Sequence, residues 1–238
     1  MMRPSIPVLA AAMLMAFPWA CPAGPASSAD LPLPEILREM DAHDRAMAAS
    51  LTGYTCDRRY SLENRRFHKK AAMRVRMTYS SPGKKRFEVL GEEGSAILCK
   101  KVLRPMLAAE EEASREDVRP RTRIVEANYD FKLLGTEIQQ GRAAYLLEVA
   151  PRTRNKFLIR GRVWVDAQNF GIMRVEAEPA RSPSILIRNT HIVQQSTRFD
   201  DVWLPLYNHS DTDSLLFGRT DVSIDSSNYV IKGRAGSR

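Results

Sequence analysis

Side chains that commonly carry catalysis or bind metals are few in this chain, and they lie far apart. The four histidines are His43, His68, His191 and His209, and none has partner residues at the spacings of hydrolase triads or zinc sites. No G-x-S-x-G motif, H-E-x-x-H motif or phosphate-binding glycine loop occurs. The sequence therefore predicts a protein that is not an enzyme, with no catalytic residue, no metal site and no cofactor.

Three cysteines offer a second kind of chemistry. Cys21 lies near the N-terminus, and Cys56 and Cys99 follow in the body of the chain. In an oxidising compartment these two either form a disulfide or remain buried thiols, because sequence spacing does not show how close two Cα atoms come. Neither has a neighbouring Cys or His at ligand spacing, so they do not predict a metal site.

The N-terminal residues predict export. A single positive charge precedes the apolar run Val8 to Ala20, and small residues follow up to Ala29. This pattern is typical of a secretory signal peptide, here residues 1–29, which is removed from the mature protein. The alternative is a lipoprotein signal, in which Cys21 is acylated and anchors the protein at the outer membrane.

The chain carries an excess of positive charge, with a formal net charge of +8. Such a balance suits an anionic partner, but export and the lack of interleaved aromatic and basic residues argue against nucleic acid. Four basic residues are predicted on the outer face of the first strands: Arg74, Arg76, Lys84 and Lys85. They either dock on an anionic membrane surface or keep the sheet soluble by charge.

Alternating apolar and polar residues predict a mostly antiparallel β-sheet. The pattern is clearest in Phe157 to Val165 and Ile172 to Ala177, which are joined by the turn-forming segment Asp166 to Gly171. The same pattern recurs on both sides of this pair, which predicts about ten strands in one domain.

Two segments have apolar residues at helical spacing instead. Glu35 to Leu51 predicts an amphipathic helix before the sheet. Ser95 to Arg115 predicts a second helical segment, which Pro105 should kink or split. The acidic run Glu110 to Glu112 near its end predicts a solvated helix face.

Four short motifs lie along the predicted sheet. They are Pro82-Gly-Lys-Lys-Arg-Phe-Glu-Val89, Gly135 to Leu146, the hairpin Arg162 to Arg174, and Trp203-Leu-Pro205. They resemble strand motifs of the periplasmic lipoprotein-carrier fold, the LolA/LolB type, which includes outer-membrane lipoprotein-sorting proteins. The RseB/MucB-type sensor domains are relatives that share this fold.

The resemblance implies a mainly β protein with helices (α+β), a strongly curved, incompletely closed antiparallel β-barrel of about ten strands covered by helices. It implies one domain over residues 30–231 in the periplasm. The Gly- and Arg-rich composition of residues 232–238 predicts a disordered tail after this domain. In the carrier family the arginine of the first motif bonds to helices that act as a lid, and Arg86 matches that position. The family usually has a short strand pair where this chain has its helical segment.

The resemblance also implies an apolar cavity between sheet and lid, which would take acyl chains because burial stabilises each CH₂ by about 0.8 kcal/mol. The candidate lining residues, each otherwise an ordinary core residue, are Met73, Val75, Met77, Phe87, Val89, Leu147, Val149, Val163, Val165 and Met173. The implied function is binding of lipid or lipoprotein acyl chains, in outer-membrane lipoprotein sorting or envelope lipid transport. The alternative is an envelope sensor on the same scaffold that binds a protein partner.

Overall fold

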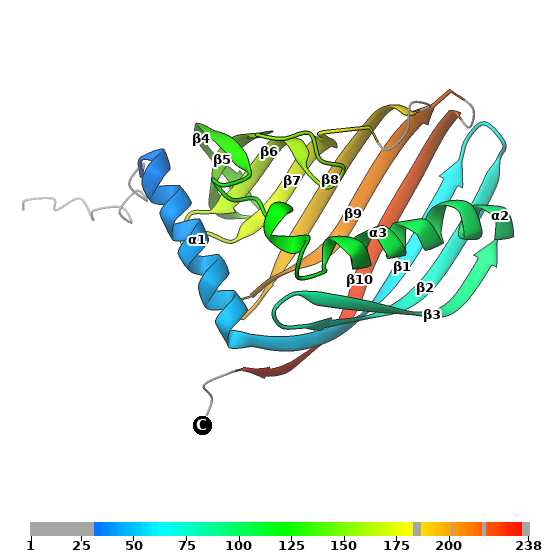
Figure 1. Cartoon of the computed structure of the whole chain (residues 1–238), viewed down its shortest axis with the longest axis horizontal. Coiled ribbons are helices and arrows are strands. Elements are labelled where there is room, and N and C mark those ends of the chain that lie inside the picture. Colours follow the sequence, from blue (N-terminus) through cyan, green and yellow to red (C-terminus); the bar gives the residue numbers. More distant parts are fainter. Residues whose placement is uncertain (1–30, 183–186, 201, 216–217, 235–238) are drawn as a thin grey trace, which may run out of the picture.

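A computed structural model describes residues 31–182, 187–200, 202–215 and 218–234. The predicted signal peptide and Cys21 lie outside the described residues, as does the end of the predicted tail. The described residues form a ten-stranded antiparallel sheet that curls into an open barrel, with helices along its concave side (Figure 1). This arrangement confirms the predicted fold class, a mainly β protein with an incompletely closed barrel and covering helices.

The chain visits the sheet almost in sequence order. The strands are β1 (Leu51–Asn64), β2 (Lys69–Ser80), β3 (Lys84–Gly94), β4 (Tyr129–Gln139), β5 (Arg142–Pro151), β6 (Ile159–Asp166), β7 (Ile172–Pro179), β8 (Ile187–Phe199), β9 (Val202–Ser214) and β10 (Gly218–Arg234). Their order across the sheet is β3-β2-β1-β10-β9-β8-β7-β6-β5-β4, so β1 pairs with β10 and the two edges are β3 and β4.

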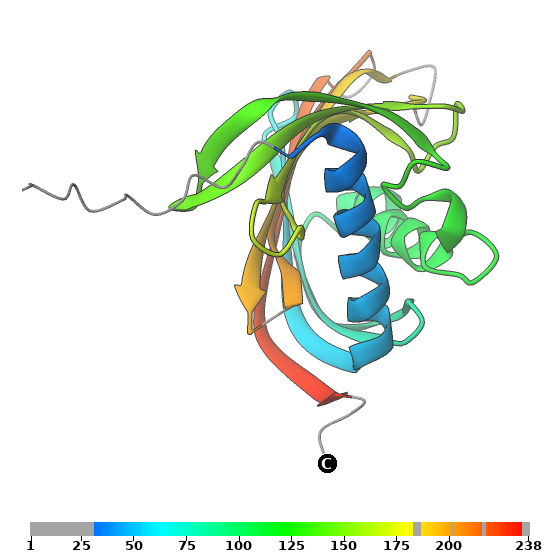
Figure 2. The same cartoon turned by 90° about the vertical axis from the view of Figure 1, so that its left-hand side faces the viewer.

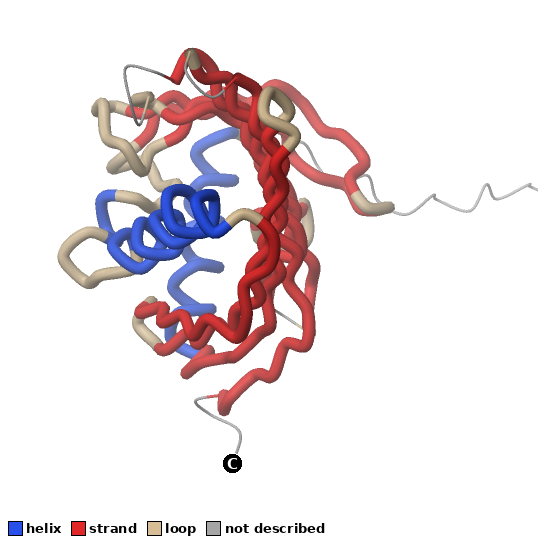
Figure 3. The backbone as a smooth tube through the Cα atoms, turned by 90° about the vertical axis from the view of Figure 1, so that its right-hand side faces the viewer, coloured by secondary structure: helices blue, strands red, loops and turns tan. Residues whose placement is uncertain are grey.

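The helices occupy the inside of the curl. They are α1 (Leu33–Ser50), α2 (Ala96–Leu98), the π-helical turn η1 (Cys99–Leu103), α3 (Arg104–Ala113) and the 3₁₀ turn η2 (Arg119–Arg121). Figures 2 and 3 show that the sheet has a C-shaped cross-section, with α1 and the segment 96–113 on its concave side. We call residues 96–113 the helical insertion, because they lie between the two edge strands in the sequence.

Strand boundaries differ from the sequence prediction at three places. Leu51 begins β1 instead of ending the first helix. β9 begins at Val202 and continues through Pro205, whereas the sequence predicted a strand that begins only at Tyr207. The predicted disordered tail was wrong at its start, because β10 extends to Arg234 and pairs Lys232 with Gly53 and Arg234 with Leu51. Pairing with β1 supplies backbone hydrogen bonds to a segment whose composition alone suggested disorder.

α1 is an amphipathic helix, as its spacing predicted. Pro34 lies in its first turn, where the missing backbone N–H has no helical partner to lose. Ile36, Leu37 and Met40 form its buried face and pack against inner-face side chains of β5, β6 and β7. Burial of such side chains contributes about 1.5–3 kcal/mol each, which holds α1 in the concavity.

The helical insertion is one continuous helical run, and Pro105 does not split it. Pro105 has no N–H to donate to the carbonyl of Lys101, so an ordinary α-helical bond is missing there. A π-helical turn accommodates the gap, in which Arg104 N–H bonds to the Cys99 carbonyl. Gly94 precedes the insertion with φ +80°, and any Cβ there would collide with the Lys70 carbonyl oxygen.

A second, smaller apolar cluster lies on the convex face of the sheet. It contains Ala144, Leu146, Trp164, Met173 and Trp203, which alternate along their strands with the inward-facing residues. The end of the β4–β5 hairpin reaches over this cluster, since Glu137 Oε2 accepts a hydrogen bond from Trp164 Nε1 at 2.8 Å. Both faces of this part of the sheet are therefore packed.

Candidate functional site

The inner face of β1, β2 and β10 forms an apolar floor beneath the helical insertion. Its buried residues are Tyr60, Leu62, Ala71, Met73, Val75 and Val222, and the insertion contributes Cys99, Leu103 and Leu107. Strand alternation places these side chains on one face because successive Cβ atoms point to opposite sides. The insertion therefore excludes water from this part of the concavity.

An ionic cluster lies at the edge of this floor. Arg58 of β1 is only 5 % exposed, and its Nη1 donates hydrogen bonds to Glu110 Oε1 at 2.9 Å and Oε2 at 3.0 Å. Lys85 Nζ of β3 donates to the same Oε1 at 2.7 Å. Glu110 belongs to α3, so one carboxylate of the insertion is held by two cations of the sheet, and we call these three residues the Glu110 cluster.

The charges of the cluster stabilise one another. Burial opposes ionisation of Glu110, but Lys85 and then Arg58 outweigh it and lower the pKa of this carboxyl to about 2. Burial also disfavours the charge on Arg58, yet the Glu110 carboxylate keeps its pKa well above the ordinary value. Glu110 and Arg58 are therefore both charged at neutral pH. Charge-assisted hydrogen bonds of this kind are about twice as strong as neutral ones.

Further polar contacts tie the insertion to β3. The backbone N–H of Lys85 donates to Ser114 Oγ at 3.1 Å, just after α3 ends. Arg104 Nε donates to Glu92 Oε1 at 2.8 Å. On the side facing β5 and β6, the described contacts are more exposed, such as that of Lys156 with Glu112 at 2.9 Å. The insertion is thus anchored more firmly along β3 than along the opposite rim.

Acid is expected to weaken the Glu110 cluster. Below the ordinary carboxyl pKa of 4.5, the unfolded chain takes up a proton at Glu110, whereas the folded protein does so only near pH 2. The free energy of unfolding should therefore fall by up to about 3 kcal/mol as the pH drops through this window. Urea unfolding of the wild type and of Glu110→Gln at several pH values checks this, because their difference in stability should shrink towards pH 2. A difference that is constant with pH would contradict it.

The structure places most predicted lining residues on the concave face. Met73 and Val75 lie in the cluster under the insertion, Met77 lies in a neighbouring cluster, and Phe87 contacts both. Leu147, Val149, Val163 and Val165 lie in the cluster that packs on α1. Val89 pairs with Val75 at the edge strand and is largely exposed.

Met173 is the exception, and its predicted place was wrong. A β-bulge in β7 pairs Val165 with Ile172 and Trp164 with Arg174, so Met173 has no partner of its own. The extra residue changes the alternation. Met173 therefore lies in the convex cluster with the two tryptophans, on the side away from the helices.

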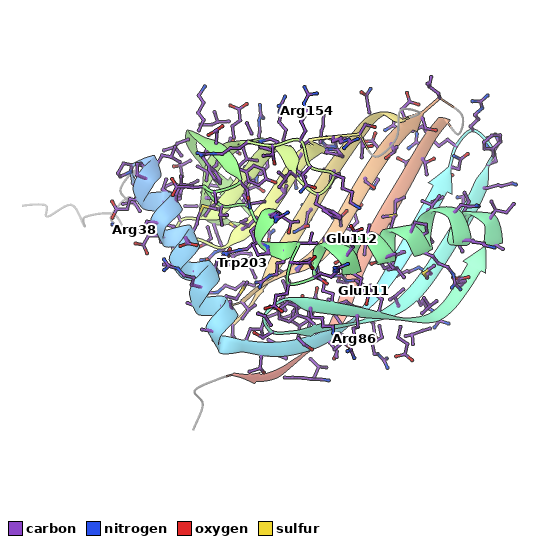
Figure 4. All side chains as sticks on the ribbon, in the orientation of Figure 1. Arg38, Arg86, Glu111, Glu112, Arg154 and Trp203 are labelled. Carbon is purple, nitrogen blue, oxygen red and sulfur yellow. The ribbon has the colours of Figure 1, made fainter. Side chains whose placement is uncertain are left out.

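Arg86 does not hold the insertion. It is exposed and pairs with Thr78, while its neighbours Lys85 and Phe87 face inward. In Figure 4, Arg86 lies on the side of β3 away from α3. The anchoring contacts come instead from Lys85, one residue earlier, and from Arg58 on β1.

Cys56 and Cys99 are both buried free thiols in the structure, so the disulfide alternative is not realised. Cys99 Sγ lies 4.0 Å from the carbonyl oxygen of Ala72, which is paired with Ser61 of β1. Ser61 is five residues from Cys56 along β1, or about 17 Å at the rise of a strand. A disulfide requires Cα atoms within about 7 Å.

Two of the four predicted outer-face basic residues lie near acidic side chains. Arg76 Nε lies 3.1 Å from Asp57 Oδ1, and Arg74 Nε lies 4.0 Å from Glu93 Oε1. Lys85 faces the concave side instead. These contacts offset part of the basic charge on the outer face.

Two clefts border the helices. One, of about 370 Å³, lies beside α1, and its lining combines apolar residues such as Leu37, Met40 and Phe131 with charged ones such as Asp41 and Arg123. The other, of about 760 Å³, lies between the β2–β3 turn and the C-terminal end of α3. Its walls include Arg115 and other charged residues. Both clefts are therefore lined by charged and apolar groups together.

Sequence reasoning missed the role of Glu110. The run Glu110 to Glu112 was expected to be a solvated face, and Glu112 does make only a surface ion pair. Arg58 was not considered either, although it alternates with apolar residues in β1. A charged residue at an inward-facing strand position requires a partner, and that is the signal that could have found it.

Residues 125–227 match the model of a family of unknown function, DUF5686. No curated protein matches this chain. Among solved structures, it is similar to a LolA superfamily protein from Nitrosomonas europaea, with 11 % identity over 85 % of this chain and 94 % of that chain and a TM-score of 0.45.

Two further solved structures are of the same general kind. One is an outer membrane lipoprotein-sorting protein domain from Vibrio parahaemolyticus, with 14 % identity over 86 % of this chain and 93 % of that chain and a TM-score of 0.43. The other is the Pseudomonas aeruginosa MucA/MucB complex, with 9 % identity over 79 % of this chain and 93 % of that chain and a TM-score of 0.28.

Two further observations on the described part of the chain concern membrane-spanning helices and metal sites. None of its helices is both long and apolar enough to cross a membrane. Its His, Cys, Asp and Glu side chains do not gather in a group of three that could hold a metal ion.

Proposed function

We propose that this protein is a non-enzymatic binding protein of the periplasm, which holds an acyl chain of a lipid or lipoprotein between the sheet and the helical insertion. In this proposal the insertion is a lid, and the Glu110 cluster holds it closed. Its process is outer-membrane lipoprotein sorting or envelope lipid transport. The observation that carries the proposal is an apolar inner surface covered by a helical segment that one charged cluster secures.

An acyl chain of ordinary length can replace the apolar burial that is lost when the lid opens. In the closed structure Leu103 and Leu107 fill the space above Met73 and Val75. Removing two leucines from this surface costs about 3–6 kcal/mol. A chain that buries about eight methylenes recovers about 6 kcal/mol, which offsets that cost. Methionine in the floor can adapt to chains of different shape.

Weakening the lid contact is expected to increase acyl binding. If only the open protein binds, the apparent dissociation constant is the intrinsic one divided by the open fraction. Lys85→Gln removes one charge-assisted bond to Glu110. We expect it to bind a fluorescent fatty-acid probe about fivefold more tightly than the wild type does, as measured by titration.

Lys156→Gln is the matched control, because Lys156 pairs with Glu112 on the same insertion but at the surface. It should bind the probe as the wild type does. If neither the wild type nor Lys85→Gln binds the probe, and lipid extraction of the purified wild type recovers no lipid, the proposal is wrong.

An envelope sensor that binds a protein partner is the second candidate. The observation that favours it is the cleft at the end of α3, whose charged lining residues Glu116, Asp117 and Arg119 can pair with charged side chains of a peptide. Recovery of a stable protein partner from envelope extracts, without lipid exchange, would support this function over the first.

A further inference from the structure

The edge strand β4 is much less protected than the edge strand β3. Among the described residues β4 has a strand neighbour on one side only, β5. Leu134 is 41 % exposed and Ile138 is 71 % exposed. Figure 2 shows the β4–β5 hairpin projecting from the body of the barrel on the convex side. By contrast, β3 carries charged residues along its length, namely Lys84, Lys85, Arg86, Glu88, Glu92 and Glu93, which is a common protection of edges.

The ladder with β5 shows which backbone groups of β4 point outward. Arg152 N–H donates to the Asn128 carbonyl at 2.9 Å, which makes this a hydrogen-bonded pair. Because such pairs alternate along an antiparallel ladder, the backbone groups of Phe131 and Leu133 point away from β5. The bulge between Leu133 and Gly135 adds one residue to β4 and shifts this alternation by one position. Beyond the bulge, the backbone groups of Thr136 and Ile138 therefore point away from β5.

We infer that β4 pairs antiparallel with β4 of a second copy of this chain, about a two-fold axis between Leu134 and Gly135. This register places Phe131 opposite the second copy's Ile138, and Leu133 opposite its Thr136. All four of these residues have outward-pointing backbone groups, so they form hydrogen-bonded pairs across the axis. An isologous contact of this kind closes as a dimer.

The same register matches side chains by face and by charge. Phe131 and Leu133 pack on the inner cluster, and strand alternation places Thr136 and Ile138 on that face. Lys132 and Glu137 lie on the outer face, and the register sets Lys132 of each copy opposite Glu137 of the other. Opposite charges directly across a ladder are favourable.

A register shifted by one residue loses these matches of side chains and backbone groups. A slip of one residue sets Phe131 opposite Glu137, which joins side chains of opposite faces and an apolar residue to a charge. It also aligns outward-pointing backbone groups with inward-pointing ones, so the ladder bonds are lost. The self-complementary sequence of β4 therefore favours a second copy of this chain over an unrelated extended peptide as the occupant of this edge.

Sedimentation equilibrium of the wild type and of two edge variants tests the dimer. Ile138→Lys places a charge in the apolar pair, and Lys132→Glu sets two glutamates opposite each other. Each should weaken dimerisation at least tenfold. Ile97→Lys is the matched control, since Ile97 is 66 % exposed on the helical insertion, and it should leave the dimer unchanged.

Cysteine pairing tests the register. A mixture of Leu133→Cys and Thr136→Cys chains should form an oxidised cross-link between copies, because these positions are about 5.5 Å apart in a hydrogen-bonded pair. Either variant alone should form far less. A wild type that stays monomeric at its solubility limit overturns the inference. A dimer that neither edge variant weakens, or an edge that takes only unrelated extended peptides, also overturns it.

Discussion

Glu110→Ala is expected to lower the free energy of unfolding by about 3 kcal/mol. Removing one partner of a buried ion pair costs about 3–5 kcal/mol, because the other charge stays buried and unpaired. The lower end applies here, since the Glu110 side chain is 27 % exposed and water can reach the space it leaves. Among the described residues Arg58 Nε has no hydrogen-bond partner, and the other contacts of the guanidinium include a long hydrogen bond to Tyr60 and the face of Phe87. Urea unfolding at neutral pH measures the change.

Glu112→Ala provides the comparison for this prediction. Glu112 lies two residues later on α3 and pairs with Lys156 at the surface (Figure 4). Exposed pairs contribute about 0–1 kcal/mol, so this variant should be close to the wild type in stability. Equal losses in the two variants would show that the Glu110 cluster is an ordinary surface contact. The lid proposal would then lose its anchoring point.

Gly171→Ala is expected to destabilise the convex cluster by about 3 kcal/mol. A Cβ on Gly171 would overlap Trp203 Cδ1 and come within 2.6 Å of its Nε1. Trp203 cannot move away easily, since it is packed with Trp164 and Nε1 donates to Asn169 Oδ1 at 2.8 Å. Overpacking of this kind costs about 1–3 kcal/mol, and loss of the indole hydrogen bond adds to it. Thermal unfolding and tryptophan fluorescence measure both effects.

Gly91→Ala is the matched control for Gly171→Ala. A Cβ at Gly91 would lie 3.2 Å from the end of the flexible Arg74 side chain, which can shift. This variant should be neutral or slightly stabilising, by up to about 1 kcal/mol, because alanine restricts the unfolded chain. If Gly171→Ala is equally well tolerated, the convex cluster is not tightly packed against the β6–β7 turn.

Much of the fold could be predicted because its signals are local. Period-two alternation reports the half-buried strands directly, and turn chemistry at Asp166 to Gly171 fixes where one hairpin reverses. Helical spacing in α1 is equally local, as is the effect of Pro105. The strand count and the mainly antiparallel arrangement follow from such segments.

The face of the sheet on which a residue lies was harder to predict, because one β-bulge reverses the alternation of the side chains that follow it. Alternation from Val175 predicts that Met173 faces inward, yet the bulge in β7 turns it to the convex side. Nothing in the local sequence marks that bulge. It forms where the curled sheet must bend, which is a property of the whole barrel.

The sequence by itself determined that this chain makes a mostly antiparallel sheet with two helical segments. Only the tertiary structure decided which charged residues hold them together. Three consecutive glutamates on a helix point about 100° apart, so which of them turns inward depends on how α3 docks. Arg58 and Glu110 are 52 residues apart in the chain. Their contact exists because β3 and the insertion fold back over β1, and no local pattern encodes that distance.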